Sequence, residues 1–396
     1  MRLHGAEAIL PCLSQVMVGW PFRSGPATPA ASPFFSISSQ PDSAMLWCES
    51  RVEDRPARQF DTVNAVCDVI ASLALALPAE DPKLICLHAA AVAMAGRLVV
   101  FPSVRRAGKS TLSVALARAG HALFGDDVLP VSVTTQGQAL GHAMGISPRL
   151  RLPLPATLDA DFRFWAGAAA GPRNAQYHYV TLDGQPAHGV TLPVGAFVIL
   201  DRQDDPCPAR LDPVSPGEAM DALLHQHFTR DRHSADVLQA MAAALTNLPV
   251  FRLTYCDLAG AVDCLTAAFA AWPGPDQPVP TDPPQAFRTV GADPVRQVAL
   301  SLDARTAQRP GTVAQVIGDR LYLADRDGRA IHRTDPLSAA IWELLAEPIT
   351  RAEIEAVLEE AFPDTAPDRI AADLYRLLAE FHLAGLTESH PALPQE

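Results

Sequence analysis

The chain has 396 residues, of which 48% are hydrophobic and 19% are charged, a balance typical of a globular protein with room for two or three domains. Its formal net charge of −13 argues against a general nucleic-acid binder, because a phosphate backbone requires a surface rich in Lys and Arg. The seven cysteines are scattered singly, with neither a CxxC pair nor zinc-like spacing, and this favours a reducing cytoplasm.

The first 45 residues are rich in Pro, Ser and Gly, and they predict a poorly ordered or loosely attached arm over residues 1–45. No basic segment precedes a long apolar run, so we expect neither a signal peptide nor a membrane partner. Apolar residues at helical spacing then predict a helix over 61–77 that ends before Pro78.

Two apolar runs, ICLHAAAVAM and LVVF, predict a pair of strands joined by a turn, followed by a helix over 109–119. The run PSVRRAGKST leads from LVVF into the first turn of that helix, which places Gly-Lys-Ser-Thr in the strand–loop–helix context of a Walker A loop. Backbone N–H groups in such a loop cradle phosphate oxygens at a helix N-terminus. The predicted nucleotide-binding residues are Ser103, Val104, Arg105, Arg106, Ala107, Gly108, Lys109, Ser110 and Thr111.

Within this loop, Lys109 is expected to reach the β- and γ-phosphates of ATP, and the Ser110 hydroxyl is expected to ligate Mg²⁺. The loop departs from the usual pattern, because Ser103 and Arg106 stand where glycine is common. A residue with a Cβ rarely adopts a positive φ, so the loop must follow another path or carry strain. A capped helix start without nucleotide is the structural alternative.

The strand-like GHALFGDD ends in two acids, Asp126 and Asp127. After a phosphate-binding loop, one acid would hold the metal through water and the other would accept the proton of an attacking hydroxyl. A surface Asp-Asp turn is the alternative.

In order and spacing, His88 in LHAAAV, then GKST, then GDD resemble the HPr kinase/phosphorylase family over about residues 45–272. The resemblance implies a compact P-loop kinase that phosphorylates a serine side chain with ATP and Mg²⁺. It also implies a phosphate-proximal His88, Asp126 as general base, and Asp127 with Ser110 on the metal side. A structural histidine bonded to backbone is the alternative for His88. No glycine-rich segment of the dephosphorylating kind is found, so phosphorylase activity is not expected.

Strand and helix patterns alternate up to residue 272 and predict an α/β layered core over 46–272. The later strands are expected at 194–200 and 250–255, and the helices at 216–228, 234–246 and 258–271. A Pro-rich stretch then predicts a linker over 273–292.

Residues 293–390 predict a separate α+β, winged-helix-like unit of three strands followed by three helices. The run DPLSAAIWELLAEPITRAEIEAVLEEAF resembles PqqD and related recognition domains of peptide-modifying enzymes. The resemblance implies that the leader of a precursor peptide adds as a strand to a sheet edge facing the helix over 365–384. The implied peptide-binding residues are Ala330, Ile331, His332, Arg333 and Thr334.

A winged-helix dimerisation or DNA-binding unit is the alternative for this C-terminal unit. Its third helix carries only Arg369 and Arg376 as arginines, against three acids, Asp368, Asp373 and Glu380. That charge balance is unsuited to a helix that binds in the major groove of DNA, and no nucleic-acid partner is expected.

The two parts together predict an ATP-dependent kinase for a Ser or Thr hydroxyl of a ribosomally synthesised peptide, with the tethered domain raising the effective peptide concentration. One alternative is a non-catalytic peptide chaperone or adaptor with a degenerate nucleotide site, which delivers peptide to other peptide-modifying enzymes. Another is a regulator of a phosphocarrier protein, which leaves the capture domain unexplained.

Overall fold

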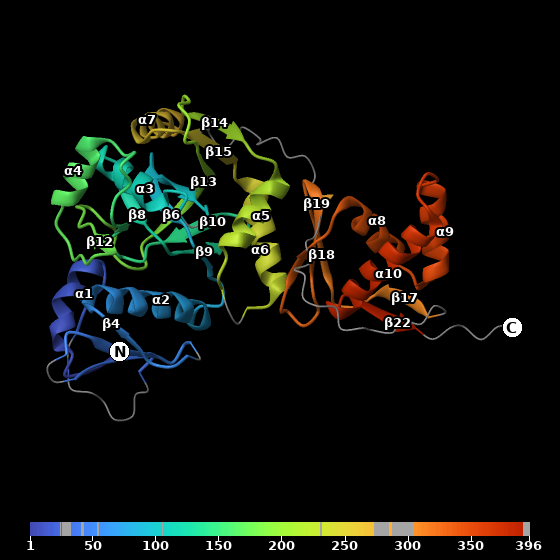
Figure 1. Ribbon diagram of the computed structural model, residues 1–396, viewed down its shortest axis with the longest axis horizontal. Helices are drawn as coiled ribbons and strands as arrows, with labels where there is room; N and C mark the ends of the chain where they lie inside the picture. Colours follow the sequence, from blue (N-terminus) through green and yellow to red (C-terminus); the bar gives the residue numbers. More distant parts are fainter. Residues whose placement is uncertain are drawn as a thin grey trace. The chain divides into compact units, whose positions relative to one another are not determined.

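The computed structural model describes residues 1–23, 25, 33–40, 43–53, 55–104, 106–229, 232–272, 285–286 and 304–390 (Figure 1). The chain divides into two compact units. The first comprises residues 1–214, 221–231 and 243–279, and the second comprises 215–220, 232–242 and 280–396. Both combine helices and strands, which confirms the predicted α/β class.

The first unit opens with a sheet whose described strands have the order β1-β2-β3-β4. Their bounds are Arg2–His4, Phe35–Ser39, Leu46–Ser50 and Arg58–Phe60. Together with η1 (Glu7–Ile9) and α1 (Leu10–Val16), this sheet buries Leu13, Phe35 and Ile37 completely. The prediction of a loosely attached arm is therefore wrong for these elements, because their short apolar patterns are buried only once they pack together with α2.

Helix α2 (Thr62–Glu80) begins at Asp61, whose side chain accepts a hydrogen bond from Asn64 N. It continues past Pro78, where the sequence predicted its end, and Pro78 is buried within its last turn. In the described chain α2 is the one helix long and apolar enough to cross a membrane. The face of α2 that carries Val63, Val66 and Val69 is instead buried in the core of the N-terminal sheet, as expected of a core helix.

The described residues of the first unit also form a nine-stranded sheet. Its main order is β5-β9-β10-β13-β7-β6-β8, with β15 paired to β13 and β14 paired to β15. The bounds are β5 Ile85–Leu87, β6 Ala90–Met94, β7 Arg97–Phe101, β8 Ala122–Gly125, β9 Leu129–Val133, β10 Ala139–His142, β13 Thr191–Arg202, β14 Arg210–Pro213 and β15 Val250–Tyr255. The central strand β13 runs parallel to β7 and β15, so the sheet brings together strands far apart in sequence.

Helices α3 (Lys109–Arg118) and α7 (Leu258–Ala268) pack on this sheet around a core that includes Phe101, Leu112 and Leu253. The remaining elements of the first unit are β11 Arg149–Arg151, α4 Ala160–Ala168 and β12 Tyr177–Tyr179. Helices α5 Pro216–Gln226 and α6 Ser234–Asn247 contribute to both units. The predicted alternation of strands and helices is confirmed, and the loop-rich stretch before β13 additionally contains α4, β11 and β12.

The second unit contains β18 (Val313–Ile317), β19 (Asp319–Ala324) and β20 (Ile331–Arg333) in antiparallel pairing, and the two-residue β16 (Gln285–Ala286) beside β19. Helices α8 Pro336–Leu344, α9 Arg351–Ala361 and α10 Pro367–Leu383 follow. The predicted order of three strands and three helices is confirmed. Among the described residues a second sheet, which the sequence did not predict, joins β21 Ile349–Thr350, β17 Arg305–Gln308 and β22 Thr387–His390.

Two segments that the sequence placed in the first domain, 215–220 and 232–242, belong to the second compact unit. There the Tyr322 hydroxyl donates to Gly217 O at 2.9 Å, and Ser234 Oγ donates to Asp325 Oδ1 at 3.2 Å. The predicted linker over 273–292 lies outside the described residues, except for β16.

Candidate active site and peptide-binding edge

The loop between β7 and α3 accommodates Ser103 and Arg106, the two residues that stand where glycine is common, in different ways. Arg106 adopts the left-handed φ of 69°, whereas the φ of Ser103 is not positive. The Ser103 side chain is buried, and its hydroxyl accepts a hydrogen bond from Leu200 N of β13 at 2.8 Å. The serine therefore satisfies a buried backbone group, while Arg106 carries the conformational strain.

Gly108 caps the start of α3 with a φ of 95°, a conformation that favours glycine. Space is also restricted there, since a Cβ would lie 3.0 Å from the Tyr255 hydroxyl. That hydroxyl donates to Ala107 O at 3.4 Å. Both the backbone and the neighbouring ring thus require the glycine before Lys109.

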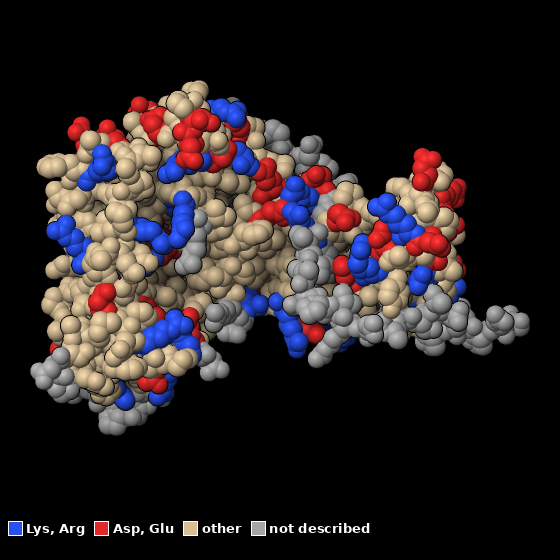
Figure 2. All heavy atoms as spheres, viewed as in Figure 1, with Lys and Arg blue, Asp and Glu red and all other residues tan. Residues whose placement is uncertain are grey.

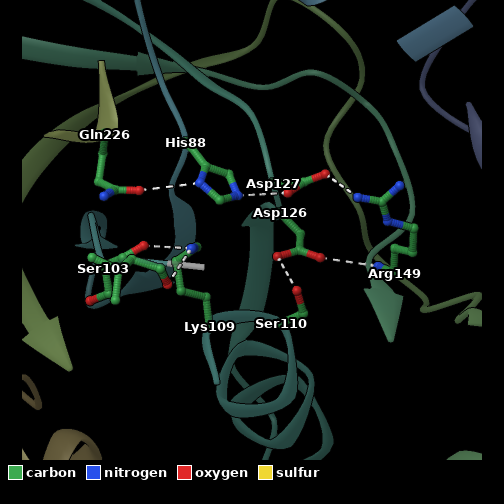
Figure 3. Close-up of polar contacts among 9 residues, drawn as sticks. His88, Ser103, Lys109, Ser110, Asp126, Asp127, Arg149 and Gln226 are labelled. Atoms are coloured by element: carbon green, nitrogen blue, oxygen red, sulfur yellow. Dashed lines mark hydrogen bonds and ion pairs between the residues drawn. The ribbon is translucent and has the colours of Figure 1, made fainter. Parts of the chain in front are cut away.

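Lys109 is buried at the first turn of α3, and its ammonium lies inside the loop (Figure 3). It donates to Ser103 O at 2.5 Å and to Val104 O at 3.3 Å. The chain has only two lysines, and the other, Lys83, is exposed. The predicted residue Arg105 lies outside the described residues.

The two acids leave the end of β8 through a tight turn. Val128 N donates to Asp126 O at 2.8 Å across a three-residue turn, and the central Asp127 has a φ of 68°. The carboxylates of Asp126 and Asp127 contact different partners (Figure 3). This turn is the local reason why adjacent acids occupy different environments.

Asp126 is buried and contacts the start of α3. Its Oδ1 accepts from Ser110 Oγ at 2.9 Å, and its Oδ2 accepts from Arg149 N at 3.0 Å. Burial, followed by the neighbouring charge of Asp127, raises the pKa of the Asp126 carboxyl, although both hydrogen bonds oppose the rise. A carboxyl with a raised pKa suits a proton acceptor.

Asp127 is held on both oxygens. His88 Nε2 lies 2.9 Å from Oδ1, and Arg149 Nη2 lies 2.5 Å from Oδ2. Burial opposes ionisation, but the hydrogen bond from His88 and the charge of Arg149 prevail and lower the pKa of Asp127 to about 2. This acid is therefore an anion throughout the physiological range.

Arg149 and Gln226 complete the site, and the sequence reasoning identified neither. The Arg149 guanidinium stacks over the Tyr177 ring at 4.6 Å, which fixes it beside Asp127. Gln226, at the end of α5, places Oε1 3.2 Å from His88 Nδ1. Arg149 stands among apolar residues in GISPRLRLP, which was a usable signal, whereas nothing near Gln226 in the sequence points to His88.

The structure thus brings together six of the residues proposed from the sequence: His88, Ser103, Lys109, Ser110, Asp126 and Asp127. Within this group, Ser110, Asp126 and Asp127 offer one hydroxyl and two carboxylates, and oxygen donors of this kind are the ones that Mg²⁺ prefers. Among the described residues no cluster of three or more His, Cys, Asp and Glu side chains forms a metal cage of its own. This donor set fits a magnesium ion shared between few protein ligands and bound phosphates.

The ladder between β19 and β20 determines which backbone groups of β20 face its open edge. Ala330 O accepts from Asp325 N at 3.3 Å, and Thr334 N donates to Leu321 O at 3.1 Å. Because inward and outward bonding alternate along an antiparallel strand, every second residue faces β19. The residues that bond inward are Ala330, His332 and Thr334. The backbone groups of Ile331 and Arg333 point away from β19, toward the edge of β20 on which no described strand pairs.

The third helix of this unit offers no cationic face. On α10, Arg369 lies 3.7 Å and Arg376 lies 2.8 Å from carboxylate oxygens of Asp373. On the face shown in Figure 2, Lys and Arg side chains are interspersed with Asp and Glu. The charges therefore do not support a DNA-binding role for this helix.

Residues 321–386, within the second unit, match the family model described as coenzyme PQQ synthesis protein D (PqqD). No curated protein matches the chain. The Hpr(Ser) kinase/phosphatase from Coxiella burnetii is similar in structure at 16% identity, with a TM-score of 0.20, over 43% of this chain and 85% of that chain.

Restoring glycine should have opposite consequences at the two unusual loop positions. Ser103→Gly should destabilise the first unit by about 1–3 kcal/mol, since Leu200 N loses its buried acceptor. Arg106→Gly should change stability by less than about 1 kcal/mol, because relief of the left-handed backbone offsets the added chain entropy. Scanning calorimetry measures both, and equal losses would contradict the described loop path.

Proposed function

We propose that this chain is a peptide kinase, which transfers the γ-phosphoryl group of ATP to a Ser or Thr hydroxyl of a precursor peptide held by its PqqD domain. The observation that carries the proposal is the convergence of Lys109, Ser110 and two differently held carboxylates at the start of one helix. Such a kinase would work in the cytoplasm, where ATP and newly made peptides are both present.

ATP would be held by the loop from Ser103 to Thr111. The first turn of α3 leaves backbone N–H groups without intrahelical acceptors, and its dipole favours an anion there. Lys109 would exchange the carbonyl oxygens of Ser103 and Val104 for phosphate oxygens. Phosphate oxygens carry negative charge, so a buried ammonium would gain electrostatic energy by exchanging neutral carbonyl oxygens for them.

Bound Mg²⁺ would supply charge neutralisation at the phosphates, and Ser110 with Asp127 are the residues assigned to hold it. Asp126 would accept the proton of the peptide hydroxyl. Its raised pKa supports this division, as does the permanent ionisation of Asp127. The hydrogen bond from Ser110 to Asp126 supports a base that would lie directly beside the proposed metal ligand.

The PqqD domain would capture the leader by strand addition at β20. The outward-facing N–H and C=O groups of Ile331 would provide hydrogen bonds to an added strand. Capture on the same chain would raise the local concentration of the acceptor hydroxyl at the kinase site, so that a weak contact suffices there.

The two lysines allow a direct test of the nucleotide site. An acyl-phosphate derivative of ATP acylates amines beside its terminal phosphates, so it should label Lys109 in the full chain, and excess ATP should suppress the labelling. Lys83, exposed and outside the site, is the internal control whose background labelling ATP should not change. Peptide mass spectrometry separates the two. Absence of ATP-sensitive labelling at Lys109 would favour the non-catalytic adaptor.

Substituting each acid separately tests the assignment of base and metal ligand. Asp126→Asn should lower kcat on the order of 100-fold or more with little change in the KM for ATP, because the base acts in the transition state. Asp127→Asn should instead raise the magnesium concentration required for half-maximal rate. Single-turnover transfer from radiolabelled ATP to short peptides encoded beside this chain measures both. The reverse pattern would mean that the two roles are exchanged.

Proline at the two middle positions of β20 should distinguish peptide capture from strand integrity. Ile331→Pro removes an outward N–H and should abolish binding of a labelled leader peptide to the full chain, as measured by fluorescence anisotropy. Ile331→Val keeps that N–H and should bind normally. His332→Pro removes an inward N–H and should destabilise the β19–β20 pairing itself. Unimpaired binding by Ile331→Pro would exclude this edge.

A further inference from the structure

The side chain of Gln226 lies against His88 and has no role in the phosphoryl transfer proposed above. It is the last residue of α5, and only 6% of its surface is exposed. Its Oε1 lies 3.2 Å from His88 Nδ1, and its carbonyl oxygen accepts from His88 N at 2.7 Å. Thus Gln226 contacts both the backbone and the ring of His88.

The row of polar contacts extends from the His88 ring to Asp127 and Arg149. His88 Nε2 lies 2.9 Å from Asp127 Oδ1, and Asp127 Oδ2 lies 2.5 Å from Arg149 Nη2. Figure 3 shows these side chains in one row, from Gln226 to Arg149. His88 and Asp127, the two inner members of the row, each have a partner on both sides, so the orientation of the His88 ring affects how Asp127 is held.

The chemistry of the two neighbours restricts the hydrogen on His88. The ionised Asp127 only accepts, so Nε2 must carry a hydrogen in this arrangement. The amide of Gln226 either accepts from Nδ1–H through its oxygen or, turned by half a rotation, donates to a bare Nδ1. In both cases Nε2–H points at Asp127, and the ring keeps one orientation.

We propose that Gln226 is a positioning residue that orients the His88 ring and thereby fixes Asp127 for phosphoryl transfer. This inference rests on the proposed kinase function for its kinetic consequence, but not for its structural one. A leucine at position 226 has a similar volume, keeps the backbone contact to His88 N and lacks a hydrogen-bonding group for Nδ1. The loss in rate should therefore come from orientation and not from nucleotide binding.

The first measurement requires neither substrate nor activity. In the full chain labelled with ¹⁵N-histidine, the His88 ring, assigned with His88→Gln among the 12 histidines, should show one state with hydrogen on Nε2. Gln226→Leu should free the ring to turn away from Asp127 and should therefore give a mixture of Nδ1–H and Nε2–H forms. Gln226→Glu, whose carboxylate accepts from Nδ1–H, should retain hydrogen on Nε2. The exposed Gln239→Leu on α6 is the matched control and should leave the His88 signals unchanged.

The second measurement is kinetic. Gln226→Leu should lower kcat on the order of 10-fold with the KM for ATP unchanged, and Gln226→Glu should recover most of that rate. Unchanged ring signals in Gln226→Leu would overturn the proposal, and so would equal rate losses in the leucine and glutamate variants. If the wild-type chain transfers no phosphate, the kinase proposal fails, and the ring signals still decide whether Gln226 orients His88.

Discussion

The three-residue turn at the end of β8 is the constraint on which the site depends. With Asp127 in a left-handed conformation, successive carboxylates cannot follow the alternation of an extended strand, and each meets its own partners. Asp126 reaches Ser110 on α3, while Asp127 lies between His88 and Arg149. The resulting environments shift the two pKa values in opposite directions, which is the usual way to obtain a proton acceptor and a permanent anion from the same residue type.

The parts of the site that follow from local pattern could be predicted from the sequence. A strand, a GKST loop and a helix place Lys109 and Ser110 whatever the rest of the chain does, and a strand ending in Asp-Asp lies near them in an α/β sheet. Arg149 and Gln226 could not be placed in this way, because tertiary folding alone brings β11 to the acid pair and the end of α5 to His88. The N-terminal arm was misjudged for the same reason: Leu13 and Phe35 are buried only against α2 and its sheet.

The second unit shows the same division between local and long-range information. Its helices were predicted well because each has an apolar stripe and a cap, including the capping box between Thr350 and Glu353. The sheet of β17, β21 and β22 was not predicted, since its strands are very short and pair across long stretches of sequence. The direction in which each backbone group of β20 points could also not be predicted, because it depends on the register with β19. That register makes Ile331, and not His332, the residue whose N–H faces the open edge.

The central claim, that a captured peptide receives a phosphoryl group on this chain, is tested most directly by intact-mass spectrometry. The full chain is incubated with Mg-ATP and a short peptide encoded beside it, with Lys109→Ala as the paired reaction. The account predicts that the peptide gains the mass of one phosphoryl group on a Ser or Thr, and that Lys109→Ala leaves the peptide unmodified while still binding it. A peptide that binds tightly to the wild-type chain but keeps its mass, with ATP unconsumed, would contradict the kinase and leave a peptide adaptor.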